Sequence, residues 1–107
     1  MKTGIELIAE ERQRQIEVEG YTEQHDSNHK VSEFILAAIS YADSAIMYAW
    51  RDEGAINDAL TNGIPYLKKT FVWGEEAFKP TSCLRDLIKL GALAAAAIDR
   101  LQREQQN

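Results

Sequence analysis

The sequence predicts an all-α fold, a small helical bundle of three long helices and a short one. Apolar residues recur at helical spacing over three long stretches, and nowhere do alternating β-branched residues indicate a strand. Of the 107 residues, 45% are hydrophobic and 27% are charged, the balance of an ordinary globular protein. This length suits a single helical domain with one core, which we expect to cover residues 1–107.

The first helix is expected over about residues 4–19. Thr3 and Glu6 have the spacing of a capping box, in which a hydroxyl and a carboxylate satisfy backbone N–H groups left unpaired in the first helical turn. Gly20 offers a stop. The apolar stripe, which Arg12 shares, comprises Ile5, Ile8, Ala9 and Ile16, and the other faces carry Glu10, Glu11, Arg14 and Glu17.

A polar segment, residues 20–31, separates the first helix from the second. It has no apolar period and is rich in side chains that bond to local backbone, so we expect an ordered loop. The second helix is expected from a cap at Ser32 to Trp50. Its wide apolar face comprises Phe34, Ile35, Ala38, Ala42, Ala45, Ile46 and Ala49.

A variable connection is expected over about residues 51–80. Gly54 breaks the preceding helix, and only Ala55–Leu60 has the pattern of a short helix. The pair Asn62-Gly63 and the proline Pro65 predict turns.

The last helix is expected to open at Pro80, Thr81 and Ser82 and to run to the end of the chain. It is apolar on two sides, which in so small a protein calls for two partners. One side comprises Leu84, Leu87, Ile88, Gly91, Ala95, Ile98 and Leu101, and the other Leu90, Leu93, Ala94 and Ala97. Small residues on this helix allow close approach of another backbone, and we therefore expect a homo-oligomer.

Charge and cysteine content exclude several classes of function. The net charge of −5, with basic residues scattered among acidic ones, leaves no basic stripe for direct nucleic-acid binding. The single cysteine, Cys83, forms no internal disulfide and indicates a reducing compartment. No apolar signal-peptide core follows the N-terminus, and the uncharged run Leu90–Ile98 is too short to span a membrane. We expect a cytoplasmic protein without a membrane partner.

Two polar clusters are candidates for a site. His25, Asp26 and His29 are good ligand types for a transition metal, although the same residues also suit a turn whose imidazoles bond to nearby carbonyls. Four carboxylates are candidates for Mg²⁺: Glu6, Glu10, Asp43 and Asp86. Asp86 also suits the start of a helix, and Asp43 could equally face solvent or pair with an arginine.

An anionic ligand is the third possibility. Arg12, Gln15, Arg85 and Lys89 suit paired bonds to phosphate-like oxygens, against the alternative of a solvated helix face. The aromatics could stack on a base, although most aromatics in a small helical protein are core residues; they are Tyr21, Trp50, Trp73 and Phe78. The sequence contains no phosphate-cradling glycine loop, no cysteine pair for zinc and no nucleophile beside an obvious base.

The two ends of the chain resemble a family of small proteins encoded in bacteriophages and prophages. The likeness rests on Glu10–Ile16, Glu19–Thr22 with His25, Asp26 and His29, and, near the end, Arg85–Leu93 and Ile98–Leu101. The family often has Trp where Tyr21 stands and Asp where Ser27 stands. The resemblance implies an accessory protein of a class that includes nucleotide-pool enzymes and antagonists of host defence.

A second resemblance is to the MazG-type all-α nucleoside triphosphate pyrophosphohydrolases, which are small, helical and oligomeric and hold Mg²⁺ on acidic residues. Their acidic pattern is not reproduced, because Arg14 and Ser40 stand at two of its glutamate positions. On this alternative the chain would be an Mg²⁺-dependent pyrophosphohydrolase that uses Glu6, Glu10 and Asp43 with Asp86 as metal ligands.

The favoured hypothesis is a phage-type accessory protein that acts by binding and needs no cofactor. It would sequester a nucleotide-like small molecule or antagonise a host defence protein, in the cytoplasm of the host. The pyrophosphohydrolase and a purely structural interaction module are the alternatives, and no catalytic residue is assigned. The expected ligand-binding residues are Arg12, Gln15, Glu19, Tyr21, His25, Asp26, His29, Arg85 and Lys89.

Overall fold

A computed structural model describes residues 1–55 and 59–106, except for the side chains of residues 26, 27, 59 and 106. The described residues form five α-helices and a short 3-10 helix, with no strand among them, so the predicted all-α class is confirmed. In chain order the elements are α1 (Gly4–Glu17), α2 (Glu23–Ser27), α3 (Val31–Asp52), α4 (Ala59–Thr70), η1 (Glu75–Ala77) and α5 (Cys83–Gln106).

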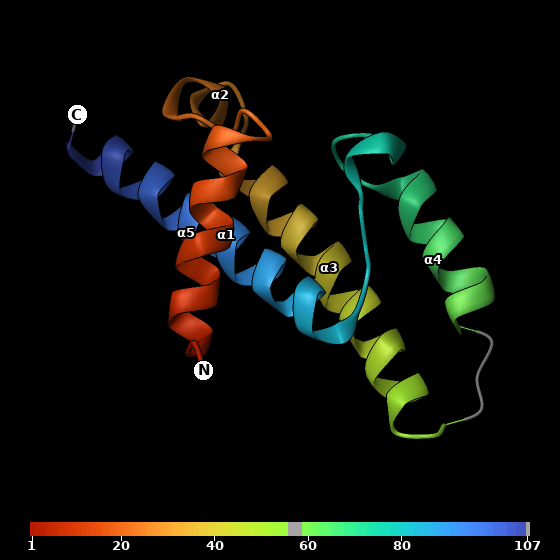
Figure 1. Cartoon of the computed structure of the whole chain (residues 1–107). Coiled ribbons are helices and arrows are strands. Elements are labelled where there is room, and N and C mark those ends of the chain that lie inside the picture. The colour runs from red at the N-terminus through yellow and green to blue at the C-terminus, as the bar shows by residue number, and fades with distance from the viewer. Residues whose placement is uncertain (56–58, 107) are drawn as a thin grey trace.

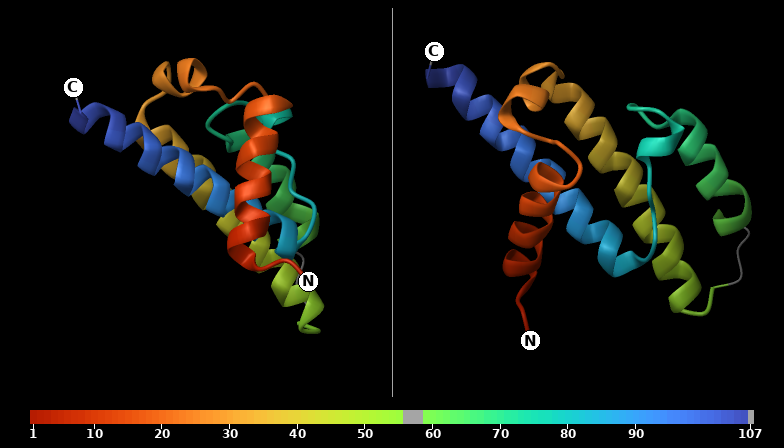
Figure 2. Two further views of the ribbon diagram at one scale, coloured as in Figure 1. Left: turned by 60° about the vertical axis from the view of Figure 1, so that its left-hand side comes forward. Right: turned by 45° about the horizontal axis from the view of Figure 1, so that its top comes forward.

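The two longest helices, α3 and α5, run antiparallel and form the centre of the molecule (Figure 1). Helix α1 packs across α5, and α4 packs along α3 (Figure 2). The segment that follows α4 returns to the start of α5. The buried core lies where α3, α5 and this returning segment meet, and its large members are Phe34, Tyr41, Leu67, Phe71, Phe78 and Leu93.

Helix α1 begins as predicted. Thr3 Oγ1 accepts a hydrogen bond of 3.2 Å from the Glu6 N–H, and a Glu6 carboxylate oxygen accepts one of 3.1 Å from the Thr3 N–H. Gly20 follows the helix with a φ of 76°, a conformation that favours glycine. The Tyr21 N–H then donates to the Gln15 carbonyl at 2.8 Å, which turns the chain back over the end of α1.

The inner face of α1 differs from the predicted stripe. Ile5 is 83% exposed, whereas Glu11 and Gln15 are buried. The helix is turned in this way because Arg85 of α5 reaches the Glu11 carboxylate at 2.9 Å. Ile8 lies against Gly91 of α5 so closely that a Cβ added to Gly91 would stand 2.5 Å from the Ile8 Cδ1.

The polar segment 20–31 contains the short helix α2, where we expected only a loop. Helix α3 then starts two residues earlier than predicted, with Lys30 rather than Ser32 at its N-cap. The backbone N–H of Lys30 donates to the Glu33 carboxylate at 2.6 Å, which is the half of a capping box that the N3 carboxylate supplies and that needs no serine.

The connection after α3 was predicted least accurately. Residues 56–58 of the expected helix Ala55–Leu60 lie outside the described residues, and the helix that follows, α4, runs straight through the predicted turns at Asn62-Gly63 and Pro65. Ile64, Leu67 and Phe71 recur at helical spacing and pack into the core. The free energy gained by burying these side chains exceeds the cost of the backbone hydrogen bond that Pro65 cannot donate.

The last helix, α5, matches the prediction in position and length. Ser82 caps it, because its Oγ accepts from the Arg85 N–H at 3.1 Å. No helix in the described part of the chain has both the length and the apolar content to cross a membrane.

Candidate functional site

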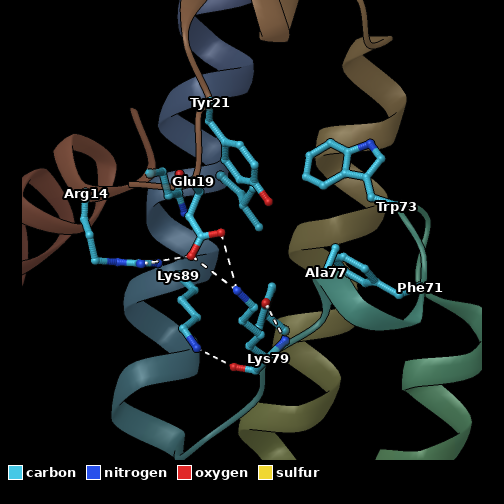
Figure 3. A pocket seen from close by; sticks show the side chains of 11 residues that line it. Arg14, Glu19, Tyr21, Phe71, Trp73, Ala77, Lys79 and Lys89 are labelled. Atoms are coloured by element: carbon cyan, nitrogen blue, oxygen red, sulfur yellow. Dashed lines mark hydrogen bonds and ion pairs between the residues drawn. The ribbon is translucent and has the colours of Figure 1, made fainter. Parts of the chain in front are cut away.

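A narrow inner pocket lies between the end of α1, the loop after it, the middle of α3 and α5, and the segment after α4 (Figure 3). Its volume is about 40 Å³. Residues distant in sequence converge there because α1 crosses α5 while the segment after α4 returns across α3. The lining residues are Arg14, Gln15, Glu19, Tyr21, Tyr41, Phe71, Trp73, Ala77, Lys79, Lys89 and Leu93.

Gln15 places a polar group inside the protein at this pocket. The residue is only 4% exposed, and within the described part of the chain its Oε1 accepts no hydrogen bond. A buried acceptor without a donor costs about 1–3 kcal/mol of stability. At the wall of a pocket, this oxygen can accept a hydrogen bond from an N–H or O–H group of a molecule that enters the pocket.

The base of the pocket is held by an ion-pair network that begins at Glu11. Arg14 binds both oxygens of the Glu11 carboxylate, at 2.9 and 2.8 Å, and reaches Glu19 at 3.0 Å. Arg85 binds Glu11 from α5. Burial by itself would raise the pKa of Glu11, but the hydrogen bond from Arg14 and the charges of Arg14, Arg85 and Lys89 hold the pKa below its ordinary value.

Two lysines form the opposite side of the pocket. Lys79 lies 3.5 Å from Glu19, and the Lys89 ammonium donates to the carbonyl of Lys79. Lys89 also lies 5.5 Å from the centre of the Tyr41 ring, a cation–π contact. Burial lowers the pKa of Lys89, whereas the nearby carboxylates Asp86 and Glu11 raise it. With Arg14, the lining thus includes three basic side chains and one carboxylate, Glu19, in a chain whose net charge is −5.

Tyr41 is a neutral, rigid part of the wall. Its hydroxyl oxygen accepts the backbone N–H of Lys79 at 3.0 Å. Burial raises the pKa of Tyr41 to about 12, so the phenol keeps its proton throughout the physiological range. This hydrogen bond positions the segment that carries Lys79 against α3.

A wider outer hollow of about 490 Å³ adjoins the inner pocket and shares Tyr21, Trp73 and Ala77 with it. His25 stacks on Tyr21 at a ring distance of 4.7 Å, and His29 lies 5.3 Å from Trp73. These four rings give the hollow an aromatic wall. Pockets that hold drug-sized ligands measure roughly 300–1,000 Å³, so the outer hollow has the required size.

Glu33 fixes the wall of the outer hollow. Its carboxylate accepts from the Trp73 indole at 3.2 Å and lies 3.0 Å from the His29 Nδ1. The backbone N–H of Lys30, followed by the bond to His29, lowers the pKa of Glu33 to about 2. The acceptor is therefore ionised at neutral pH, which keeps Trp73 and His29 in place.

The structure brings together most of the predicted ligand-binding residues. Gln15, Glu19, Tyr21 and Lys89 line the inner pocket, while His25 and His29 line the outer hollow. Two arginines have other positions. Arg12 donates to the carbonyl of Tyr21 at 3.3 Å, and Arg85 binds Glu11 beneath the pocket. The side chain of Asp26 lies outside the described part of the structure.

Arg14, Tyr41 and Lys79 were not predicted as site residues. Arg14 was predicted on a solvated face of the first helix, Tyr41 lies in the second predicted helix, and Lys79 lies in the predicted variable connection. Trp73 was considered for stacking on a base but was favoured as a core residue. The pattern Phe71, Trp73 and Phe78 in a polar stretch is the one sequence signal that this connection is anchored in the molecule.

The four carboxylates considered for Mg²⁺ lie in separate settings. Glu6 belongs to the helix cap, Glu10 pairs with Lys2, and Asp43 is exposed on α3. Asp86 is fully buried and accepts from the Ser44 hydroxyl at 2.7 Å. Among the described residues, no three His, Cys, Asp or Glu side chains lie close enough to hold a metal ion.

The comparisons with known proteins gave no family model that matches the chain, and no curated protein or solved structure matches it at a significant level.

Proposed function

We propose that the protein binds a small molecule with a planar ring and an anionic group, of the kind that nucleotides represent, and holds it without chemical change. The observation that carries the proposal is the buried Gln15 amide, whose oxygen accepts no hydrogen bond at the wall of the inner pocket within the described structure. A ligand N–H or O–H group would complete it.

The shape of the two hollows suggests how such a ligand lies. The inner pocket, at about 40 Å³, has room for a small polar group but not for a ring, since about 10–15 Å³ holds one water molecule. The ring and the bulk of the ligand belong in the outer hollow, against the faces of Tyr21, His25 and Trp73. The anionic group lies outside the inner pocket toward Lys79, whose side chain is 59% exposed, because the three guanidinium nitrogens of Arg14 already bind Glu11 and Glu19.

The wider role that we propose is that of a phage-type accessory protein that lowers the free concentration of its ligand in the host cytoplasm. The resemblance of both ends of the chain to a phage-encoded family supports this setting. Residues that line hollows, rather than a flat polar surface, favour a small molecule over a host defence protein as the ligand.

The test is thermal unfolding of the purified protein with a panel of nucleotides, cyclic nucleotides and divalent metals. A ligand that binds only the native state at about 100 times its Kd stabilises that state by about 2.7 kcal/mol. We expect at least one nucleotide to raise the Tm and to be recovered intact. Cleavage of a triphosphate to a monophosphate only with Mg²⁺ would instead identify a pyrophosphohydrolase.

The variant Gln15→Met tests the site itself. It removes the buried acceptor at similar volume, so we expect the ligand-free protein to gain about 1–3 kcal/mol while the ligand-induced rise in Tm is lost. Gln13→Met is the matched control, because Gln13 is exposed on the same helix and bonds Glu17. A nucleotide that stabilises wild type and Gln15→Met equally would place the site elsewhere.

A further inference from the structure

An uncovered apolar groove runs along the pair α3 and α5. It has a volume of about 260 Å³ and is lined by apolar side chains of both helices, among them Ile35, Ala38 and Ile39 of α3 and Leu90, Ala94 and Ala97 of α5. Ile35 and Ile39 are each about half exposed, at 51% and 49%. Large aliphatic side chains grouped in this way on a helix pair mark an interaction surface.

The apolar face extends beyond the groove with the same spacing on both helices. Along α3, Ile35, Ile39 and Ile46 are separated by four and then seven residues; along α5, read in reverse, Ile98, Ala94 and Leu87 repeat that spacing. Because α3 and α5 run antiparallel (Figure 2), the two series follow the same order along the helix pair, and Ile35, Ile39 and Ala94 line one groove. Ile46, Ile98 and Leu87 are likewise exposed.

The whole chain has more surface and a larger radius than a compact monomer. Its accessible surface is 6731 Å², against about 6,000 Å² for a monomeric protein of 12.1 kDa. Its radius of gyration is 14.5 Å, against about 13 Å for a chain of this length. The excess surface, about 700 Å², is close to the roughly 800 Å² that each partner buries in a standard interface.

We propose that this face, which we call the α3/α5 face, binds a second copy of the chain in a two-fold symmetric dimer. Each copy carries net charge −5, so two copies repel each other, and the surface on which they can associate with the least added repulsion is one without ionisable groups; the groove lining holds none. Two antiparallel helix pairs that face each other form a four-helix layer with apolar residues inside. The groove shares no lining residue with the inner pocket, so the dimer leaves that pocket open.

The test is the mass in solution of the full chain, measured by sedimentation equilibrium over a range of concentrations. We expect wild type to reach twice the 12.1 kDa of one chain. Ile39→Glu places a charge in the groove and should return the mass to that of a single chain. Tyr66→Glu, a matched change at a 65% exposed position of α4, should leave the dimer intact.

The mass of the wild type decides the proposal even if Ile39→Glu fails to fold. A wild-type mass that stays at that of one chain at tens of micromolar would overturn it, as would a dimer that survives Ile39→Glu in a folded variant. Loss of the dimer in both variants would also count against it, because the contact would then not be confined to the α3/α5 face.

Discussion

Glu11 shows how one buried carboxylate holds two helices together. It lies on α1 with its side chain 1% exposed, and it binds Arg14 of its own helix and Arg85 of α5. Both arginines keep contact with water, which lowers the cost of their charges. Gln15, one turn further along the helix, is also buried, but no described group donates a hydrogen bond to its oxygen. Its side chain lines the inner pocket instead of binding α5.

Replacement of Glu11 by Gln should lower stability near neutral pH by about 1–3 kcal/mol, because the bonds to Arg14 and Arg85 lose their charge assistance. The pKa of Glu11 is lower in the folded than in the unfolded chain. Its contribution is therefore fully present above the ordinary pKa of a glutamate and is lost as the pH falls through the folded value. Urea unfolding of both proteins at neutral pH and at about pH 3 should show the difference shrinking in acid.

The exposed neighbour provides the control for this experiment. Glu10→Gln changes the same charge on the same helix at a position paired with Lys2 near the surface. It should change stability by less than about 0.5 kcal/mol at either pH. A Glu11→Gln effect that is equally large in acid would show that packing, rather than the ion pairs, accounts for it.

At the level of helices, the start of α5 is fastened to the middle of α3 by Asp86. One oxygen of the buried carboxyl accepts from the Ser44 hydroxyl at 2.7 Å, and the other accepts from the Thr81 N–H at 3.0 Å. Asp86 thus places a favourable negative charge in the first turn of α5, as the sequence predicts, and also makes a contact between helices. The bond to Thr81 also fixes the segment that leads from Lys79 into α5.

Asp86→Ala should cost about 1–3 kcal/mol, because the Thr81 N–H loses its acceptor and the Ser44 hydroxyl keeps only the Tyr41 carbonyl of its own helix. Asp43→Ala is the matched control, because Asp43 is exposed on α3 and its loss should cost less than about 0.5 kcal/mol. The free energies of unfolding of the two variants in urea give the comparison. Equal effects would contradict the assignment of Asp86 as the residue that joins α3 to α5.

The molecule as a whole combines two proposed interactions of opposite electrostatic character. The inner pocket gathers Arg14, Lys79 and Lys89 and should attract an anion, whereas the α3/α5 face is apolar on a chain that repels its own copies. The inner pocket and the groove of the α3/α5 face share no lining residue, so a change in solvent can alter ligand binding and dimerisation separately.

Salt should therefore act on the two interactions in opposite directions. Raising the ionic strength from about 0.1 M to about 1 M shortens the Debye length from about 10 Å to about 3 Å. We expect nucleotide binding to weaken, because the attraction to the lysines is screened, and dimerisation to strengthen, because the repulsion between the chains is screened. Calorimetric titration and sedimentation over this range measure the two. A dimer that weakens with salt would indicate a contact made by ion pairs.

The sequence by itself determined the all-α class and the positions of α1, α3 and α5. Apolar spacing and capping are local properties: the Thr3 and Glu6 box and the Ser82 cap act within one turn, so the residues alone predict them. The sequence also predicted Gln15, Tyr21, His25, His29 and Lys89 as ligand-binding residues, and all five line one of the two hollows. Helix formation does not call for polar and aromatic side chains at these positions, so their presence could be noticed without a structure.

Only the tertiary structure decided which of those residues meet and what completes the site. Arg85 binds Glu11 across 74 residues, and Trp73 binds Glu33 across 40, and neither pairing leaves a local pattern. The contact with Arg85 turns α1 so that Glu11 and Gln15 face inward. Burial of Leu67 and Phe71 in the core keeps α4 helical through Pro65. Burial energy is shared among distant residues, and for that reason it overrides local preference at these positions.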